Sequence, residues 1–319
     1  MINIKFWGVR GSVPSPLTPA QISLKVKQAI ELSKQGLPIP FEIESTYGGN
    51  TTCVEVNCGN ELFILDMGTG VRELGKAQLQ QAFKTKSLNG TILQSHVHWD
   101  HIQGFPFWGP LYLPRRQFSC NFDFFGGKQW DSQLDLVYRS QMDVPNFPVN
   151  LKELEQTAMC MNFQTIYDGW EKLFSTSEGF IGYMIKVLAR KLNHPQETFG
   201  YRIEYQNKSI AFTTDHEPYG MIVPKPLAEL VQGVDLWITD CQYSHDDYVG
   251  KNSVQKLGWG HSYPNYIALV AKECGVKKVI TTHHDPDADD FKIKLLSTQV
   301  QDDSKIDTFA AYEGLEINV

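Results

Sequence analysis

The segment Ser95-His96-Val97-His98-Trp99-Asp100-His101 places three histidines and one aspartate within six residues. It follows the short apolar stretch Thr91 to Leu93, which predicts a strand that ends just before His96. In an extended segment alternate side chains share a face, so His96 and His98 can reach one metal ion together. The chain then turns, and Asp100 and His101 point toward a second centre. A histidine-rich surface loop is the alternative interpretation.

Three later residues complete a candidate ligand set, since His194, Asp215 and His283 each come just after a predicted strand. Taken singly, each is as typical of a turn as of a metal site. Taken in this order and at strand ends, they indicate metal ligands, with His284 as the alternative to His283. Imidazole and carboxylate donors suit Zn, Mn or Fe, and the lack of nearby thiolates argues against a purely structural zinc.

The order H-x-H-x-D-H, then His, Asp and His, resembles the ligand set of the metallo-β-lactamase superfamily, and the likeness runs from Phe6 to Pro286. It implies an α/β fold, a four-layer αβ/βα sandwich, with a dinuclear site at one edge between two sheets. The resemblance implies two divalent metal ions, Zn or Mn, with Fe also compatible. It assigns His96, His98 and His194 to the first ion, and Asp100, His101 and His283 to the second. Asp215 would bridge the two ions, and His283 is preferred to His284 because it directly follows the strand Lys278 to Thr282.

Two further segments resemble parts of this superfamily. Asp66, in Asp66-Met67-Gly68, matches an acid that lies beneath the ligands and orients a histidine, although a simple Asx-turn residue would look the same. The stretch Gly258 to Ser262 resembles the G-H-S-T segment of tRNA 3′-processing endonucleases, with Tyr263 in place of the threonine. There a histidine paired with an acid protonates the leaving oxygen of a phosphodiester, which implies His261 and Asp240 here. A helix-capping histidine is the alternative for His261.

The stretches Phe6 to Pro14, Tyr47 to Thr51 and His101 to Phe107 make the whole chain resemble bacterial hydrolases loosely described as cyclic phosphodiesterases. The expected reaction is hydrolysis of a small cyclic phosphate or cyclic nucleotide by a metal-bridging hydroxide. His261 would be the general acid, and Asp100 would accept a proton from the attacking water. Substrate contacts are expected from four residues of the loops: Arg10, Ser12, Asn50 and Ser262. Glycine-flanked turn residues would give the same pattern.

Three other functions remain open. A tRNA-processing endonuclease of that branch usually carries a long arm between the third histidine and the bridging aspartate, and two strands and a turn fill the interval from His194 to Asp215. A lactonase or thioesterase on the same fold would leave His261 and Asp240 without a role. A non-catalytic nucleotide sensor would bind its ligand without consuming it.

Composition sets the remaining expectations. The 319 residues are 42% hydrophobic with a net charge of −7, which fits a globular protein without a nucleic-acid partner. No apolar run spans a membrane, the first residues lack a signal peptide, and the six cysteines form no C-x-x-C pair, so we expect reduced thiols and a cytoplasmic location. One domain is expected over 1–319, with an aromatic-rich insert at about 105–193 that includes Trp130. The resemblance also implies a homodimer.

Overall fold

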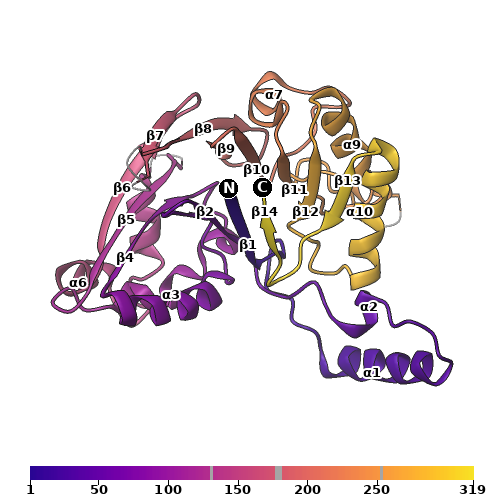
Figure 1. Cartoon of the computed structure of the whole chain (residues 1–319), viewed down its shortest axis with the longest axis horizontal. Coiled ribbons are helices and arrows are strands. Elements are labelled where there is room, and N and C mark those ends of the chain that lie inside the picture. The colour runs from indigo at the N-terminus through magenta and orange to yellow at the C-terminus, as the bar shows by residue number, and fades with distance from the viewer. Residues whose placement is uncertain (130–131, 177–181, 252–253) are drawn as a thin grey trace.

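Two seven-stranded mixed sheets lie face to face in a computed structural model that describes residues 1–129, 132–176, 182–251 and 254–319. Apolar side chains from the inner faces of both sheets form one cluster, in which Phe6 and Val54 meet Ile203 and Ile280. Helices cover the outer faces, so the layers run helix, sheet, sheet, helix (Figure 1). The predicted αβ/βα sandwich is confirmed.

The first sheet has the order β14-β1-β2-β3-β4-β5-β6. Its strands are β1 (Ile2–Gly8), β2 (Cys53–Cys58), β3 (Glu61–Leu65), β4 (Ser87–Leu93), β5 (Ser119–Gly127), β6 (Cys160–Ile166) and β14 (Glu316–Asn318). Strands β2 and β3 form the predicted hairpin. Helix α3 (Val71–Thr85), which sequence periodicity did not predict, places Val71 and Leu74 against the outer-face residues Ile64 and Ile92. Strand β4 ends at Leu93, three residues before His96.

The second sheet has the order β13-β12-β11-β10-β9-β8-β7. Its strands are β7 (Glu171–Ser175), β8 (Met184–Leu192), β9 (Thr198–Tyr205), β10 (Lys208–Thr213), β11 (Leu236–Asp240), β12 (Lys278–Thr282) and β13 (Asp307–Ala310). Helices α7 (Lys225–Val231), α9 (Pro264–Glu273) and α10 (Asp290–Ser304) pack on its outer face. The ends of β8, β10 and β12 precede His194, Asp215 and His283, so one edge of this sheet carries these candidate ligands.

The segment 105–193 is mostly part of the sandwich, which corrects the expectation of an insert. It supplies β5 and β6 to the first sheet and β7 and β8 to the second. Where this segment is described, four short helices add to this frame: η1 (Phe105–Phe107), η2 (Gly109–Tyr112), α5 (Leu134–Ser140) and α6 (Leu151–Thr157). Several of its aromatic side chains, such as Phe105, Trp108 and Phe124, are buried in the core beneath them. Trp130 lies outside the described residues.

An arm of two helices, α1 (Pro19–Lys34) and α2 (Phe41–Glu44), projects from the sandwich below α10 (Figure 1). Thr18 caps α1, and the predicted helical period over Gln21 to Lys34 is confirmed, but no residue of α1 is buried. The helix α8 (His245–Tyr248) lies in the loop after β11. Among the described helices, none combines the length and apolar character that crossing a bilayer requires. All six cysteines are free, and only Cys160 is exposed.

Candidate metal centre

The first donor cluster joins loops from both sheets. His96 and His98 follow β4, His194 follows β8 and Asp215 follows β10. One donor atom from each lies within 4.8 Å of all the others. The His98 Nδ1 atom is 2.9 Å from His96 Nε2 and 3.2 Å from His194 Nε2. The four residues that the sequence grouped by order are therefore together in space.

The second cluster contains Asp100, His101 and His283. Asp100 and His101 lie on the single turn α4 (Trp99–Ile102), and His283 follows β12. The His283 Nε2 atom is 3.0 Å from Asp100 Oδ2 and 3.2 Å from His101 Nε2. Gly11 lies against the His283 ring, where any β-carbon would overlap the imidazole. The loop after β1 therefore closes this side of the cluster only because residue 11 is a glycine.

Asp215 lies between the clusters and turns one oxygen to each. Its Oδ2 atom is 3.6 Å from His96 Nε2, whereas its Oδ1 atom is 3.3 Å from His101 Nε2 and 3.2 Å from His283 Nε2. Asp215 and His283 both have positive φ values, 55° each. A left-handed conformation is uncommon for residues other than glycine and gathers at functional sites. This backbone geometry brings both side chains to the sheet edge.

The donor set fits divalent metal ions. Two ligands at about 2.0–2.1 Å from a tetrahedral zinc ion lie roughly 3.3 Å apart. Separations of 2.9 Å between His96 and His98, 3.2 Å between His101 and His283, and 3.6 Å between His96 and Asp215 lie close to that spacing. Nitrogen and carboxylate oxygen are donors that Zn, Mn and Fe all accept.

The ligand histidines are held by their second ring nitrogens. His101 Nδ1 is 2.7 Å from Asp66 Oδ2, His283 Nδ1 is 3.0 Å from Gln242 Oε1, and His194 Nδ1 is 3.1 Å from the Gly260 carbonyl oxygen. Such contacts fix the tautomer and turn the opposite nitrogen toward a metal. Asp66 also accepts hydrogen bonds from the Ser95 backbone and hydroxyl. The position predicted for Asp66, beneath the ligands, matches this geometry.

The two clusters differ in protonation. Burial lowers the pKa of His194 to about 4 and depresses the pKa of His96 well below its usual value. These imidazoles are neutral at pH 7, which is the form that binds a metal. Burial also acts to lower the pKa of His101, but the carboxylates of Asp100 and Asp215 outweigh it and raise that pKa well above the usual value. Carboxylates therefore dominate the field of the second cluster.

His261 lies at the rim of this centre, as the resemblance implied. Its Nδ1 atom is 3.5 Å from Asp240 Oδ2 and 3.8 Å from Asp215 Oδ2, and its ring stacks on that of His283 with centroids 5.0 Å apart. Burial acts to raise the pKa of the Asp240 carboxyl, but contacts with His216 and His261 lower it to about 2. Asp240 is therefore a carboxylate at neutral pH and faces the ring of His261.

Sequence reasoning missed three residues that hold this rim in place. His216 Nδ1 is 3.2 Å from Asp240 Oδ1, so Asp240 lies between two histidines. Glu217 accepts backbone hydrogen bonds from Gly258 (2.6 Å) and Gly260 (3.1 Å). Gln242 supports His283. Their nearness in sequence to predicted site residues could have identified them. His216 and Glu217 directly follow Asp215, and Gln242 lies two residues after Asp240.

The four residues expected to contact substrate fall in different places. Ser12 is exposed, and its backbone N–H donates to Asp100 Oδ2 at 2.7 Å, so it borders the centre. Ser262 is fully buried, and its hydroxyl donates to the His216 carbonyl oxygen at 2.7 Å. The Asn50 amide donates to Glu313 Oε2 at 3.0 Å. Ser262 and Asn50 thus have partners within the protein, and their contact with substrate stays a prediction.

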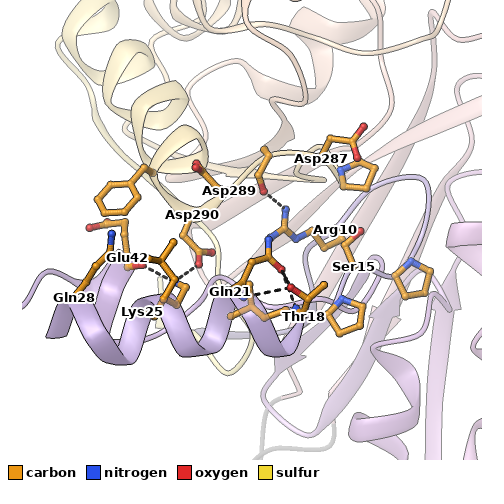
Figure 2. A pocket seen from close by; sticks show the side chains of 17 residues that line it. Arg10, Ser15, Thr18, Gln21, Lys25, Gln28, Glu42, Asp287, Asp289 and Asp290 are labelled. Carbon is orange, nitrogen blue, oxygen red and sulfur yellow. Dashed lines mark hydrogen bonds and ion pairs between the residues drawn. The ribbon is translucent and has the colours of Figure 1, made fainter. Parts of the chain in front are cut away.

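Arg10 is also a structural residue. Its side chain is buried and donates to the carbonyl oxygens of Gly48, Asp285 and Ala288. Figure 2 shows it in the wall of a separate cavity of about 620 Å³ between α1 and the start of α10, where Lys25 pairs with Asp290. Arg10 joins the base of the arm to the loop after His284, and its contact with substrate stays a prediction.

His283 and His284, which follow β12, have different partners, and this difference decides between them as the candidate ligand. His284 donates from Nε2 to the Ala311 carbonyl oxygen at 2.9 Å, and its ring packs edge-on against Tyr47. Burial lowers its pKa to about 3. Among the clustered donors of the described residues, His283 is included and His284 is not.

Comparison with known proteins agrees with this architecture. The family model described as "Beta-lactamase superfamily domain" matches residues 61–284. Ribonuclease BN from Cronobacter sakazakii is 26% identical over 279 residues, which cover 73% of this chain and 83% of that protein.

Solved structures show the same fold at low identity. The metallo-beta-lactamase fold protein YhfI from Bacillus subtilis aligns with a TM-score of 0.62 at 13% identity and covers 99% of this chain and 98% of its own. A diphosphatase from the PhnP family gives a TM-score of 0.62 at 16% identity, with 100% and 98% covered. The short form of human tRNase Z gives 0.55 at 18%, with 99% of each chain covered. The fold implies a hydrolase that uses divalent metal ions, and the family match spans His96 to His283: the chain belongs to the beta-lactamase superfamily domain family.

Proposed function

We propose that this protein is a phosphodiesterase with two divalent metal ions, Zn or Mn, that hydrolyses a small cyclic phosphate or cyclic nucleotide. The observation that carries the proposal is the position of His261, which lies beside the metal centre with an ionised carboxylate, Asp240, facing its Nδ1 atom at 3.5 Å. Hydrolysis of a phosphodiester needs an acid for its poor alkoxide leaving group. Thioester cleavage releases a stable thiolate and gives this pair no comparable role.

Metal ions held by the two clusters would lower the pKa of a bound water and neutralise charge on the phosphate oxygens. Asp215, with one oxygen toward each cluster, would fix the spacing between them. Asp100 Oδ2 lies next to His283 and accepts from the Ser12 backbone N–H, so it is placed to accept a proton from the attacking water. His261 would keep a proton on Nδ1 toward Asp240 and deliver one from Nε2 to the leaving oxygen.

A ligand role is the main competitor for His261. Its ring nitrogen, one Asp215 oxygen and a His283 nitrogen also lie within 4.8 Å of one another. The two roles differ in a measurable way, because loss of a ligand lowers metal content and loss of an acid does not. His261→Ala that keeps two metal ions per chain but loses turnover supports the acid role.

The leaving group supplies a sharper test. We expect His261→Ala to slow hydrolysis of cyclic nucleotides by about 10²–10⁴-fold, the usual worth of a general acid. With bis(p-nitrophenyl) phosphate the loss should be much smaller, because nitrophenolate departs without a proton. The assay uses Mn- and Zn-loaded protein, with Asp215→Ala as a control that loses both activities. Equal loss on both substrates at full metal content would remove the acid assignment.

A tRNA 3′-processing-type endonuclease is the second candidate, favoured by the similarity to Ribonuclease BN. Strands β9 and β10 occupy the interval from Thr198 to Thr213, where that class carries its arm, and the net charge is −7. Cleavage of a tRNA precursor with no turnover of cyclic nucleotides would favour it over our proposal. Lactone or thioester cleavage that survives His261→Ala, or nucleotide binding without turnover, would instead indicate a lactonase or thioesterase, or a sensor.

A further inference from the structure

The loop before His261 presents a large aromatic side chain to solvent at the rim of the metal centre. Trp259 is 48% exposed and is two residues from His261. Tryptophan is a common anchor in binding sites. The position of Trp259 beside the candidate acid therefore makes it a candidate contact for a ligand.

This loop is held in one conformation. The buried carboxylate of Glu217 accepts from the backbone N–H groups of Gly258 and Gly260 on either side of Trp259. Tyr248 donates its hydroxyl to the same carboxylate at 2.6 Å. Both glycines have positive φ values, 83° and 89°. The indole is thus fixed by its backbone while half of its surface stays open.

The loop is also pressed against the metal centre. The Gly260 carbonyl oxygen contacts His194 Nδ1 at 3.1 Å, and a β-carbon at Gly260 would overlap the His194 ring. The buried ring of Tyr243 lies 6.5 Å from the Trp259 ring and 5.7 Å from that of His261. Trp259, Tyr243 and His261 therefore form one row of rings that leads from solvent to the metal cluster.

A positive charge accompanies the indole. The Lys256 ammonium lies 4.0 Å from the Trp259 ring centroid and 5.6 Å from that of Tyr243. A lysine over an aromatic face helps to hold the ring in place and adds positive potential at the rim. In a chain with a net charge of −7, this local charge favours an anionic ligand near the metal centre.

We propose that Trp259 is the platform on which the base of a nucleotide substrate stacks, with Lys256 supplying positive charge beside it. The inference rests on the proposed phosphodiesterase function and narrows its substrate to phosphates that carry a planar aromatic ring. Stacking on an aromatic side chain is tolerant of base identity because every base has a π-face. The site should therefore accept purine and pyrimidine nucleotides alike and discriminate against phosphates without a base.

The test compares a cyclic nucleotide, 3′,5′-cyclic AMP, with ribose 3,5-cyclic phosphate, which lacks the base. Trp259→Ala should raise KM for cyclic AMP about 10-fold, within the range of one lost base–aromatic stack, and leave KM for the base-free diester unchanged. Trp259→Phe should restore most of the loss. Lys256→Gln should raise KM for both diesters by a similar, smaller factor. The exposed Tyr167, on the turn between β6 and β7, provides the control Tyr167→Ala, which should change neither.

Binding separates failure of this inference from failure of the proposed function. Calorimetry of the metal-loaded protein with AMP and with ribose 5-phosphate measures the stacking contribution without turnover. Preference for AMP that disappears in Trp259→Ala upholds the platform even if neither diester is hydrolysed, in which case only the reaction is wrong. Equal affinity for the two ligands, or a preference that Trp259→Ala leaves intact, overturns the platform whatever the activity.

Discussion

The Nδ1 atom of His101 lies 2.7 Å from the Oδ2 atom of Asp66, and both side chains are fully buried. Asp66 thereby sets the orientation of a histidine whose other nitrogen faces the second cluster. The carboxylate also holds Ser95, the residue before His96. One buried acid thus supports ligands of both clusters from beneath.

We expect Asp66→Asn to weaken metal binding about 10- to 100-fold, the usual effect of losing a carboxylate partner of a ligand histidine. Asparagine has nearly the same shape and tolerates the positive φ of 62° at this position, so the fold should persist. Competition with a chelator of known affinity measures the change. Asp123→Asn, on β5, is the control and should bind metal as the parent does. Unchanged affinity in Asp66→Asn would show that the contact is only structural.

The glycines on either side of Trp259 offer a matched pair of substitutions. Both have left-handed backbones, but a β-carbon at Gly258 meets nothing within 4 Å, whereas one at Gly260 overlaps the His194 ring. Gly258→Ala should cost only the backbone strain, about 1–2 kcal/mol of stability. Gly260→Ala should in addition displace His194 and reduce the metal content of the first cluster. Thermal unfolding and metal analysis distinguish the two effects, and equal metal content in both variants would contradict the close approach.

Adjacent histidines should behave differently on substitution. His283→Ala removes a donor from the second cluster and should lower the bound metal by one ion per chain. His284→Ala leaves the donors in place but orphans the Ala311 carbonyl oxygen and removes a buried ring, so it should retain its metal and lose about 1–3 kcal/mol of stability. Metal analysis beside chemical denaturation checks both. A His284→Ala protein that loses metal would reverse the assignment.

Removal of the metal should destabilise the whole sandwich, because each cluster takes donors from loops of both sheets. A ligand present at about 1,000 times its dissociation constant adds about 4 kcal/mol to the folded state. EDTA should therefore lower the melting temperature, and Zn or Mn should restore it in a concentration-dependent way. Asp215→Ala, which lacks the carboxylate shared by both clusters, should respond much less. A melting temperature indifferent to EDTA in the parent protein would argue against bound metal.

Sequence alone predicted which donors cluster, because their chemistry is carried by short patterns at strand ends. The strands before His96, Asp215 and His283 are short, buried and bounded by polar residues, so their ends were visible. The choice of His283 over His284 also followed from its place directly after β12. These features depend on neighbouring residues in the sequence, so they can be predicted without knowledge of the fold.

The misread segment 105–193 has a physical cause. Strand β5 is paired in parallel on both sides, and residues 124–127 are buried without a break. The first half of β5 alternates exposed and buried residues, but this second half is covered on both faces and shows no alternation, so its aromatics resembled an added layer. Helix α3 was missed because its buried stripe includes Gln78 and Gly75 beside Leu74. The partners of Arg10 and Asn50 within the protein, Ala288 and Glu313, could not be predicted because they lie far away in sequence.

The turn between β6 and β7 divides the donors into two groups. His96, His98, Asp100 and His101 precede it, whereas His194, Asp215 and His283 follow it. A chain cut at this turn would give two fragments, neither of which holds a complete cluster. The apolar core between the sheets and the pairing of β1 with β14 would already favour their association, and a metal that takes donors from both fragments should strengthen it. The same geometry would then make the affinity of two polypeptides for each other respond to metal concentration.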